Sequence, residues 1–107
     1  MITQEEAESA VQFMIDSAGP LGKAVERSIM ADRMLKHIKA LEMKKRNESA
    51  LGAQEREAYA SEAYKEALIE DAVAAGELAK IRALREGADA KIRMHQTEQA
   101  TMRAARV

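Results

Sequence analysis

A proline-free stretch of about 45 residues, from Ser61 to Arg106, constrains the fold of this chain more than any other feature. Apolar residues recur along it in steps of three, four and seven, which is the spacing of one face of an α-helix. The stripe consists of Ala67, Ala74, Leu78, Ile81, Ala88 and Ile92, with Leu68, Leu84 and Met102 beside it. A single helix of this length extends roughly 65 Å. Such a helix needs a partner for its apolar stripe, and we expect the preceding residues to supply it.

The composition favours thin helical packing over a compact core of large side chains. Of the 107 residues, 3% are aromatic, and much of the 47% apolar fraction is alanine, which buries little area. Helices packed through Ala, Met, Leu and Ile suit this composition. Because a thin seam buries little surface per residue, we expect a homo-oligomer. Its seam is predicted on the long helix, at Leu78, Ile81, Leu84, Ala88, Ile92 and Met102.

Two further features of the long helix bear on its neighbours. Gly76 and Gly87 lie inside it, and each costs about 1 kcal/mol relative to alanine. Either they are tolerated weak points, or a neighbouring backbone comes close there, as at a subunit contact. The sequence alone leaves both interpretations open.

Two helices are predicted before the hairpin corner. A Thr-x-x-Glu capping box beginning at Thr3 starts a helix over about 3–17. We expect Gly19, as a left-handed cap, and Pro20 to end this helix, which then folds back onto the others. A second, amphipathic helix is expected over about 21–47.

Residues 51–60 are either a short helix at the hairpin corner or the first turns of the long helix. Ser61 can cap a new helix, which favours a separate corner helix followed by a long helix over about 61–105. The predicted architecture is therefore all-α: a single domain over 1–107, forming an elongated antiparallel helical hairpin or coiled coil with a short N-terminal helix.

Charge alternates in blocks although the net charge is only −1. Residues 1–22 and 47–79 are acidic, whereas residues 23–46 and 80–107 are basic. Antiparallel packing of the hairpin is expected to place the basic end near Lys44 beside the acidic start of the long helix. The acidic N-terminus has the wrong sign for a signal peptide, and no apolar run approaches the ~20 residues that cross a bilayer. Together with the lack of cysteine, this predicts a soluble cytoplasmic protein with no membrane partner.

The sequence contains no pattern that indicates catalysis. His37 and His95 have no partner in the spacing of a zinc-binding HExxH motif, so we expect both to be surface histidines. No glycine-rich phosphate loop or nucleophile elbow is present. We therefore expect a protein that is not an enzyme, with no catalytic residue, no cofactor and no metal.

Basic residues are the best functional lead in the sequence. The first basic cluster consists of Lys36, Lys39, Lys44, Lys45 and Arg46, and the second consists of Arg82, Arg85, Lys91, Arg93, Arg103 and Arg106. Repeated in a ring of subunits, they form a positive surface for a phosphate backbone. Few aromatics are available for base stacking, so electrostatics would dominate the affinity. The alternative is that the first cluster only pairs with the acidic start of the long helix.

The stretch Glu66–Glu86, the Lys91-Ile-Arg-Met segment and the stretch Gln96–Arg106 resemble a group of small helical proteins from the recombination and replication genes of tailed phages. The corner Glu55-Arg56-Glu57-Ala58 is also similar to that group. Many of its members carry a tryptophan near the end of the long helix, where this chain has Met94-His95. The layout of a basic helix, a turn and a long helix is similar to the recombination mediator of T-even phages, an oligomer that binds single-stranded DNA and helps to load the recombinase.

This resemblance implies a non-enzymatic phage accessory protein in DNA recombination or replication, acting in the host cytoplasm. It implies that the two basic clusters bind single-stranded DNA and that the helical faces bind a recombinase or an annealing protein. Two alternatives stay open: a protein-interaction module that inhibits or adapts a host protein, and a structural assembly component without nucleic-acid binding. In the first of these alternatives, the charge blocks serve hairpin pairing and partner choice.

Overall fold

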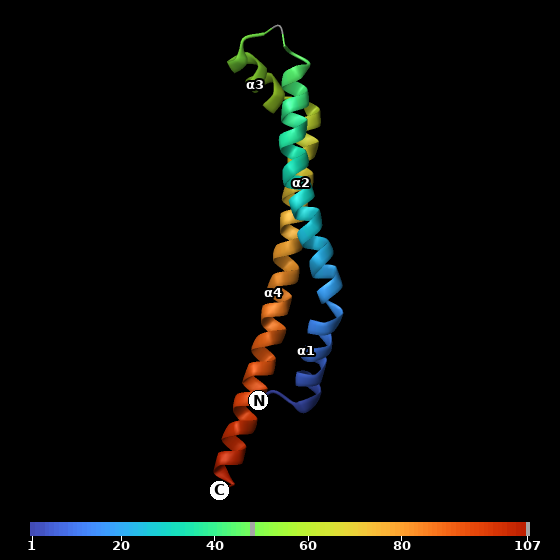
Figure 1. Ribbon diagram of the computed structural model, residues 1–107. Coiled ribbons are helices and arrows are strands. Elements are labelled where there is room, and N and C mark those ends of the chain that lie inside the picture. The colour runs from blue at the N-terminus through green and yellow to red at the C-terminus, as the bar shows by residue number, and fades with distance from the viewer. Residues whose placement is uncertain (48, 107) are drawn as a thin grey trace. The chain divides into compact units, whose positions relative to one another are not determined.

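A computed structural model describes residues 1–47 and 49–106, and all regular structure within them is helical (Figure 1). The helices are α1 (Gln4–Asp16), α2 (Ala18–Lys44), α3 (Leu51–Tyr59) and α4 (Glu62–Ala105). The prediction of an all-α chain is thereby confirmed. The chain divides into two compact units: a terminal unit, Met1–Lys23 with Ala79–Val107, and a hairpin unit, Ala24–Leu78.

In the terminal unit, α1 packs on the second half of α4. The capping box at its start is present, because the Thr3 hydroxyl accepts from the Glu6 N–H at 3.0 Å and the Glu6 carboxylate accepts from the Thr3 N–H at 3.3 Å. Small residues form the contact: Ala7 and Ala10 of α1 and Ala88 of α4 are buried. The first helix thus covers part of the apolar stripe of the long helix.

The end of α1 differs from the prediction. Among the described residues no glycine has positive φ, so Gly19 forms no left-handed cap. Ser17 is instead a one-residue junction with helical dihedral angles, and α2 begins at Ala18. Pro20 lies in the first turn of α2, where the N–H that proline lacks has no intrahelical acceptor in any case. The second helix therefore begins before the predicted residue 21, and it ends at Lys44 rather than at residue 47.

In the hairpin unit, α2 and α4 are antiparallel and α3 lies at the corner between them (Figure 1). Arg27, near the start of this part of α2, forms ion pairs of 2.7 Å with Glu70 and 2.5 Å with Glu77 of α4. The separate corner helix, expected over 51–60, is present as Leu51–Tyr59. Its Ala58 is completely buried.

Alanine dominates the core, as the composition predicts. The buried apolar residues are Ala7, Ala10, Ala24, Ala31, Ala58, Ala74, Leu78 and Ala88. Among the described residues, no large side chain is completely buried. Many methionines, leucines and isoleucines instead keep about half of their area in contact with solvent, which leaves apolar surface available for other molecules.

Candidate functional site

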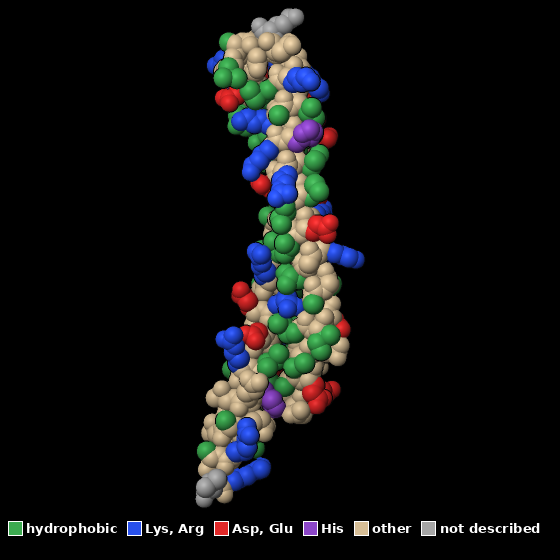
Figure 2. All heavy atoms as spheres, viewed as in Figure 1, with side chains coloured by type: hydrophobic (Ala, Val, Ile, Leu, Met, Phe, Trp, Pro, Cys, Tyr) green, Lys and Arg blue, Asp and Glu red, His purple; other side chains and the backbone are tan. Residues whose placement is uncertain are grey.

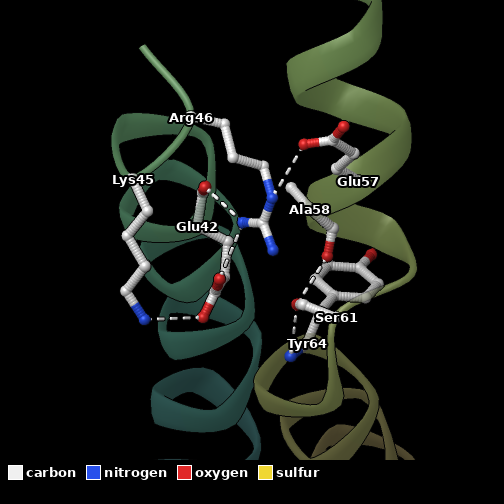
Figure 3. Close-up of polar contacts among 7 residues, drawn as sticks. All are labelled: Glu42, Lys45, Arg46, Glu57, Ala58, Ser61 and Tyr64. Carbon is white, nitrogen blue, oxygen red and sulfur yellow. Dashed lines mark hydrogen bonds and ion pairs between the residues drawn. The ribbon is translucent and has the colours of Figure 1, made fainter. Parts of the chain in front are cut away.

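A cluster of charged side chains lies at the corner of the hairpin unit, where α2 ends and α3 follows (Figure 3). At its centre is Glu42, whose side chain is only 7% exposed. The Arg46 guanidinium donates to the Glu42 carboxylate at 2.9 Å, and the Lys45 ammonium approaches it at 3.0 Å. These two hydrogen-bonded cations, Arg46 first, hold the pKa of Glu42 below its ordinary value. A nearly buried carboxylate is thus kept ionised by two cations that directly follow its helix.

Arg46 connects the end of α2 to α3. Its guanidinium also donates to the backbone carbonyl of Glu42 at 2.7 Å, and its Nε lies 3.0 Å from the Glu57 carboxylate of α3 (Figure 3). A cation at this position satisfies a carbonyl of the last helical turn and suits the negative end of the helix dipole. Arg46 therefore has a structural role that its position in a basic run does not reveal.

Ser61 joins α3 to α4, as the sequence predicts for a cap. Its hydroxyl donates to the carbonyl of Ala58 at 2.7 Å and accepts from the backbone N–H of Tyr64 at 3.2 Å (Figure 3). One hydroxyl thereby satisfies a carbonyl at the end of α3 and an N–H at the start of α4.

Two tyrosines and a lysine form a second contact at the same corner. The rings of Tyr59 and Tyr64 meet edge to face, with centroids 5.1 Å apart. The Lys39 ammonium lies 4.6 Å from the centroid of the Tyr59 ring and 3.9 Å from the Glu55 carboxylate. This is the geometry of a cation–π contact supported by an ion pair. Two of the three aromatic residues in the chain are thus used inside the corner.

The first basic cluster is therefore largely paired with acids. Lys39, Lys45 and Arg46 engage the corner as described, and Lys36 pairs with Asp32 of its own helix at 3.2 Å. Only Lys44 of this cluster is exposed without an acidic partner among the described residues. The acids of the corner belong to α2 and α3. The acidic start of α4, which was expected to neutralise this cluster, pairs with Arg27 instead, through Glu70, because α3 intervenes at the corner.

The second basic cluster separates into inward and outward members. Arg85 turns inward and donates to the Met14 carbonyl at 2.9 Å and to the Ser17 hydroxyl at 2.6 Å, so it is not placed to contact a phosphate. Its sequence position carried the signal, since Arg85 follows Ile81 by four residues within the apolar spacing. Arg93 pairs with Asp89 at 2.8 Å.

The remaining members of this cluster are exposed and have no acidic partner among the residues that the structure describes. They are Arg82, Lys91, Arg103 and Arg106. Each of them is positioned to meet an anionic ligand.

Only part of the predicted oligomer seam lies exposed at the surface of the chain. Leu78 and Ala88 are buried within the chain, and Ile81 and Ile92 are half-buried there. The chain's own helices thus cover the stripe that was expected to pair subunits. Leu84 and Met102 alone among the six are exposed.

His95 is partly exposed and makes contacts that its sequence neighbours do not reveal. Its two ring nitrogens lie 3.4 Å from the Ile2 carbonyl and 2.9 Å from the Gln4 side-chain oxygen, while Glu98 accepts from the Ile2 N–H at 3.0 Å. These α4 side chains hold the residues before α1. His37 is exposed. Across residues 1–47 and 49–106, His, Cys, Asp and Glu side chains form no group of three or more that could hold a metal ion.

Within the same ranges, no helix is both long enough and apolar enough to span a membrane. No protein-family model matches the chain, and no significant similarity to a curated protein or to a solved structure was found.

Proposed function

We propose that this chain is a non-enzymatic accessory protein of phage DNA recombination or replication, which acts by binding a recombinase or an annealing protein. The phage setting rests on the resemblance of residues 66–106 to small proteins of phage recombination genes. The binding role rests on one structural observation: large apolar side chains gather on one side of the hairpin unit.

We call this surface the apolar face, and it consists of Met30, Met34 and Leu41 of α2 with Ile69 and Val73 of α4. Each of these side chains is between 42% and 56% exposed. Figure 2 shows apolar side chains reaching the surface between charged groups. An apolar surface of this kind is typical of a protein-binding site.

Ion pairs of Arg27 place both halves of the apolar face on the same side of the hairpin unit. Arg27 reaches across to Glu70 and Glu77, and Val73 lies between these two acids on α4. Met30 and Met34 follow Arg27 by three and seven residues, which keeps them on the same side of α2. Methionine is well suited to such a surface because its side chain adapts to the shape of a partner.

The test is a binding assay between the full chain and a phage recombinase or annealing protein, using matched substitutions. Val73→Asp places a charge in the apolar face, whereas Leu68→Asp places the same charge on the opposite flank of α4, at a residue of similar exposure. We expect Val73→Asp to weaken binding at least about tenfold and Leu68→Asp to leave it unchanged. Equal effects of the two substitutions would contradict the proposal that the apolar face is the binding site.

A second candidate function is binding of single-stranded DNA. It is supported by five exposed cations of the two basic clusters that have no acidic partner among the described residues: Lys44, Arg82, Lys91, Arg103 and Arg106. Such cations release counterions when they contact phosphates, so binding would fall steeply with added salt.

Fluorescence anisotropy with a labelled oligonucleotide tests this candidate. We expect Arg82→Glu, Arg103→Glu and Arg106→Glu together to weaken binding and to flatten its salt dependence. Lys44→Glu tests the hairpin unit separately. Arg46→Glu is unsuitable for this purpose, because Arg46 holds Glu42 and Glu57. If both variants bound the oligonucleotide with unchanged affinity, binding of single-stranded DNA through these cations would be ruled out.

A further inference from the structure

We infer that two copies of this chain pair through an exposed stripe of α4 in the terminal unit, in antiparallel orientation. We call it the outer stripe, and it consists of Leu84, Gly87, Lys91, Met94 and Glu98. Its members are separated by three or four residues, so they follow one face of the helix. This pairing is independent of the recombination partner proposed above.

The outer stripe lies beside the face of α4 that packs on α1. Leu84, Gly87 and Lys91 each precede by one residue a side chain of that inward face, namely Arg85, Ala88 and Ile92. The two largest apolar members of the stripe, Leu84 and Met94, remain 51% and 52% exposed. The outer stripe is therefore a second apolar face, and α1 does not cover it.

Next to the outer stripe, the surface between α1 and α4 is hollowed into an open groove of about 720 Å³. Phe13 and Ala10 of α1 line it on one side, and Leu84, Gly87 and Lys91 of α4 line it on the other. A Cβ atom at Gly87 would have no neighbour within 4 Å. The chain's own packing therefore does not require glycine there, while a second helix could approach the backbone closely at this point.

The charges of the outer stripe favour a second copy of this chain as the partner, and they favour an antiparallel orientation of the two helices. Lys91 and Glu98 lie two turns apart and carry opposite signs. A parallel second copy would set Lys91 against Lys91 and Glu98 against Glu98. An antiparallel copy, related by a two-fold axis near Met94, brings Lys91 of each copy to Glu98 of the other. The two charges of the stripe are thus self-complementary, as a two-fold symmetric contact requires, while Leu84 and Gly87 face Ala105 and Met102 of the other copy.

Glu98 can take part in this contact while it holds the N-terminus. One of its oxygens accepts from the Ile2 N–H at 3.0 Å, and a carboxylate has further lone pairs for a lysine. With two large apolar residues per copy, we expect weak pairing, with a dissociation constant on the order of 10 µM.

The experiment is sedimentation equilibrium of the full chain from about 1 to about 500 µM, a range that brackets this affinity. Lys91→Glu and Glu98→Lys are measured separately and as an equimolar mixture. Arg82→Glu is the matched control, because it makes the same charge change as Lys91→Glu on the opposite side of α4. Circular dichroism verifies that each variant keeps its helix content.

We expect the wild type and Arg82→Glu to form dimers, and each of the two stripe variants to dissociate at least about tenfold more readily. The mixture regains dimers, because the introduced glutamate of one variant then faces the introduced lysine of the other, while the native Glu98 faces the native Lys91. A wild type that stays monomeric or forms a larger assembly would overturn the pairing, as would a mixture that fails to regain dimers. None of these results bears on the apolar face, whose substitutions lie in the hairpin unit.

Discussion

Arg85 donates a hydrogen bond of 2.6 Å to the hydroxyl of Ser17, the residue that joins α1 to α2. Its guanidinium also reaches the Met14 carbonyl, so a cation of α4 satisfies acceptors at the C-terminal end of α1. At the other end of α1, His95 and Glu98 hold Ile2. Polar side chains of α4 therefore fasten both ends of the first helix.

The first prediction concerns this fastening. Ser17 is only 7% exposed, so Arg85→Ala leaves its hydroxyl and the Met14 carbonyl without their donor. We expect a loss of about 1–3 kcal/mol in the free energy of unfolding, measured by urea denaturation. Arg82→Ala, at an exposed arginine three residues earlier, is the control and should change stability by less than about 0.5 kcal/mol. Equal stabilities of the two variants would show that Arg85 is a surface residue.

Three neighbouring cations, Lys44, Lys45 and Arg46, should contribute unequally to the stability of the chain. Arg46 holds Glu42 and Glu57, Lys45 holds only Glu42, and Lys44 has no acidic partner among the described residues. We therefore expect the melting temperature to fall most in Arg46→Ala, less in Lys45→Ala and least in Lys44→Ala. Three equal shifts would mean that the cluster acts only through its net charge.

The third prediction is a pH dependence of stability. The pKa of Glu42 in the folded chain lies below its ordinary value of 4.5, because Arg46 and Lys45 stabilise the carboxylate. This contribution is complete above pH 4.5 and is lost as the pH falls through the lower, folded pKa. Urea denaturation between about pH 6 and about pH 2 should show a smaller acid-side loss for Glu42→Gln than for the wild type. An identical loss of stability in the two proteins would show that Glu42 does not contribute to the destabilisation by acid.

The fourth prediction concerns glycine in the hairpin unit. A Cβ atom at Gly76 would have no neighbour within 4 Å, so alanine fits there without strain. We expect Gly76→Ala to raise the free energy of unfolding by up to about 1 kcal/mol, because alanine is the better helix former. The reverse change at the adjacent exposed residue, Ala75→Gly, should lower it by a similar amount. A loss of stability in Gly76→Ala would mean that another surface packs on Gly76.

The helices themselves could be predicted from the sequence because their signals are local. The Thr3 capping box and the Ser61 cap each satisfy backbone groups within a few residues, and the apolar spacing of α4 depends on helical geometry alone. The end of α1 was predicted to within about one residue, but the roles of Gly19 and Pro20 were predicted wrongly, since these residues can form either a stop or the first turn of a new helix. The backbone of Ser17 stays helical in the structure, and Gly19 and Pro20 therefore lie in the first turn of α2.

The roles of individual charges could not be predicted, because they depend on which helix lies opposite. Arg46 and Arg85 belong to basic runs in the sequence, yet one joins α2 to α3 and the other fastens α1. The position of Arg85 within the apolar spacing was the only local sign of its inward direction. Acidic partners such as Glu57 become identifiable only once α3 is placed at the corner.

The most direct test of the proposed function is hydrogen exchange of the chain with and without a phage recombinase or annealing protein, the proposed partner. Contact with the apolar face predicts slower exchange in the segments of α2 around Met30 and Met34 and of α4 around Ile69 and Val73. Slower exchange confined to other segments, or no change at saturating partner, would contradict the account.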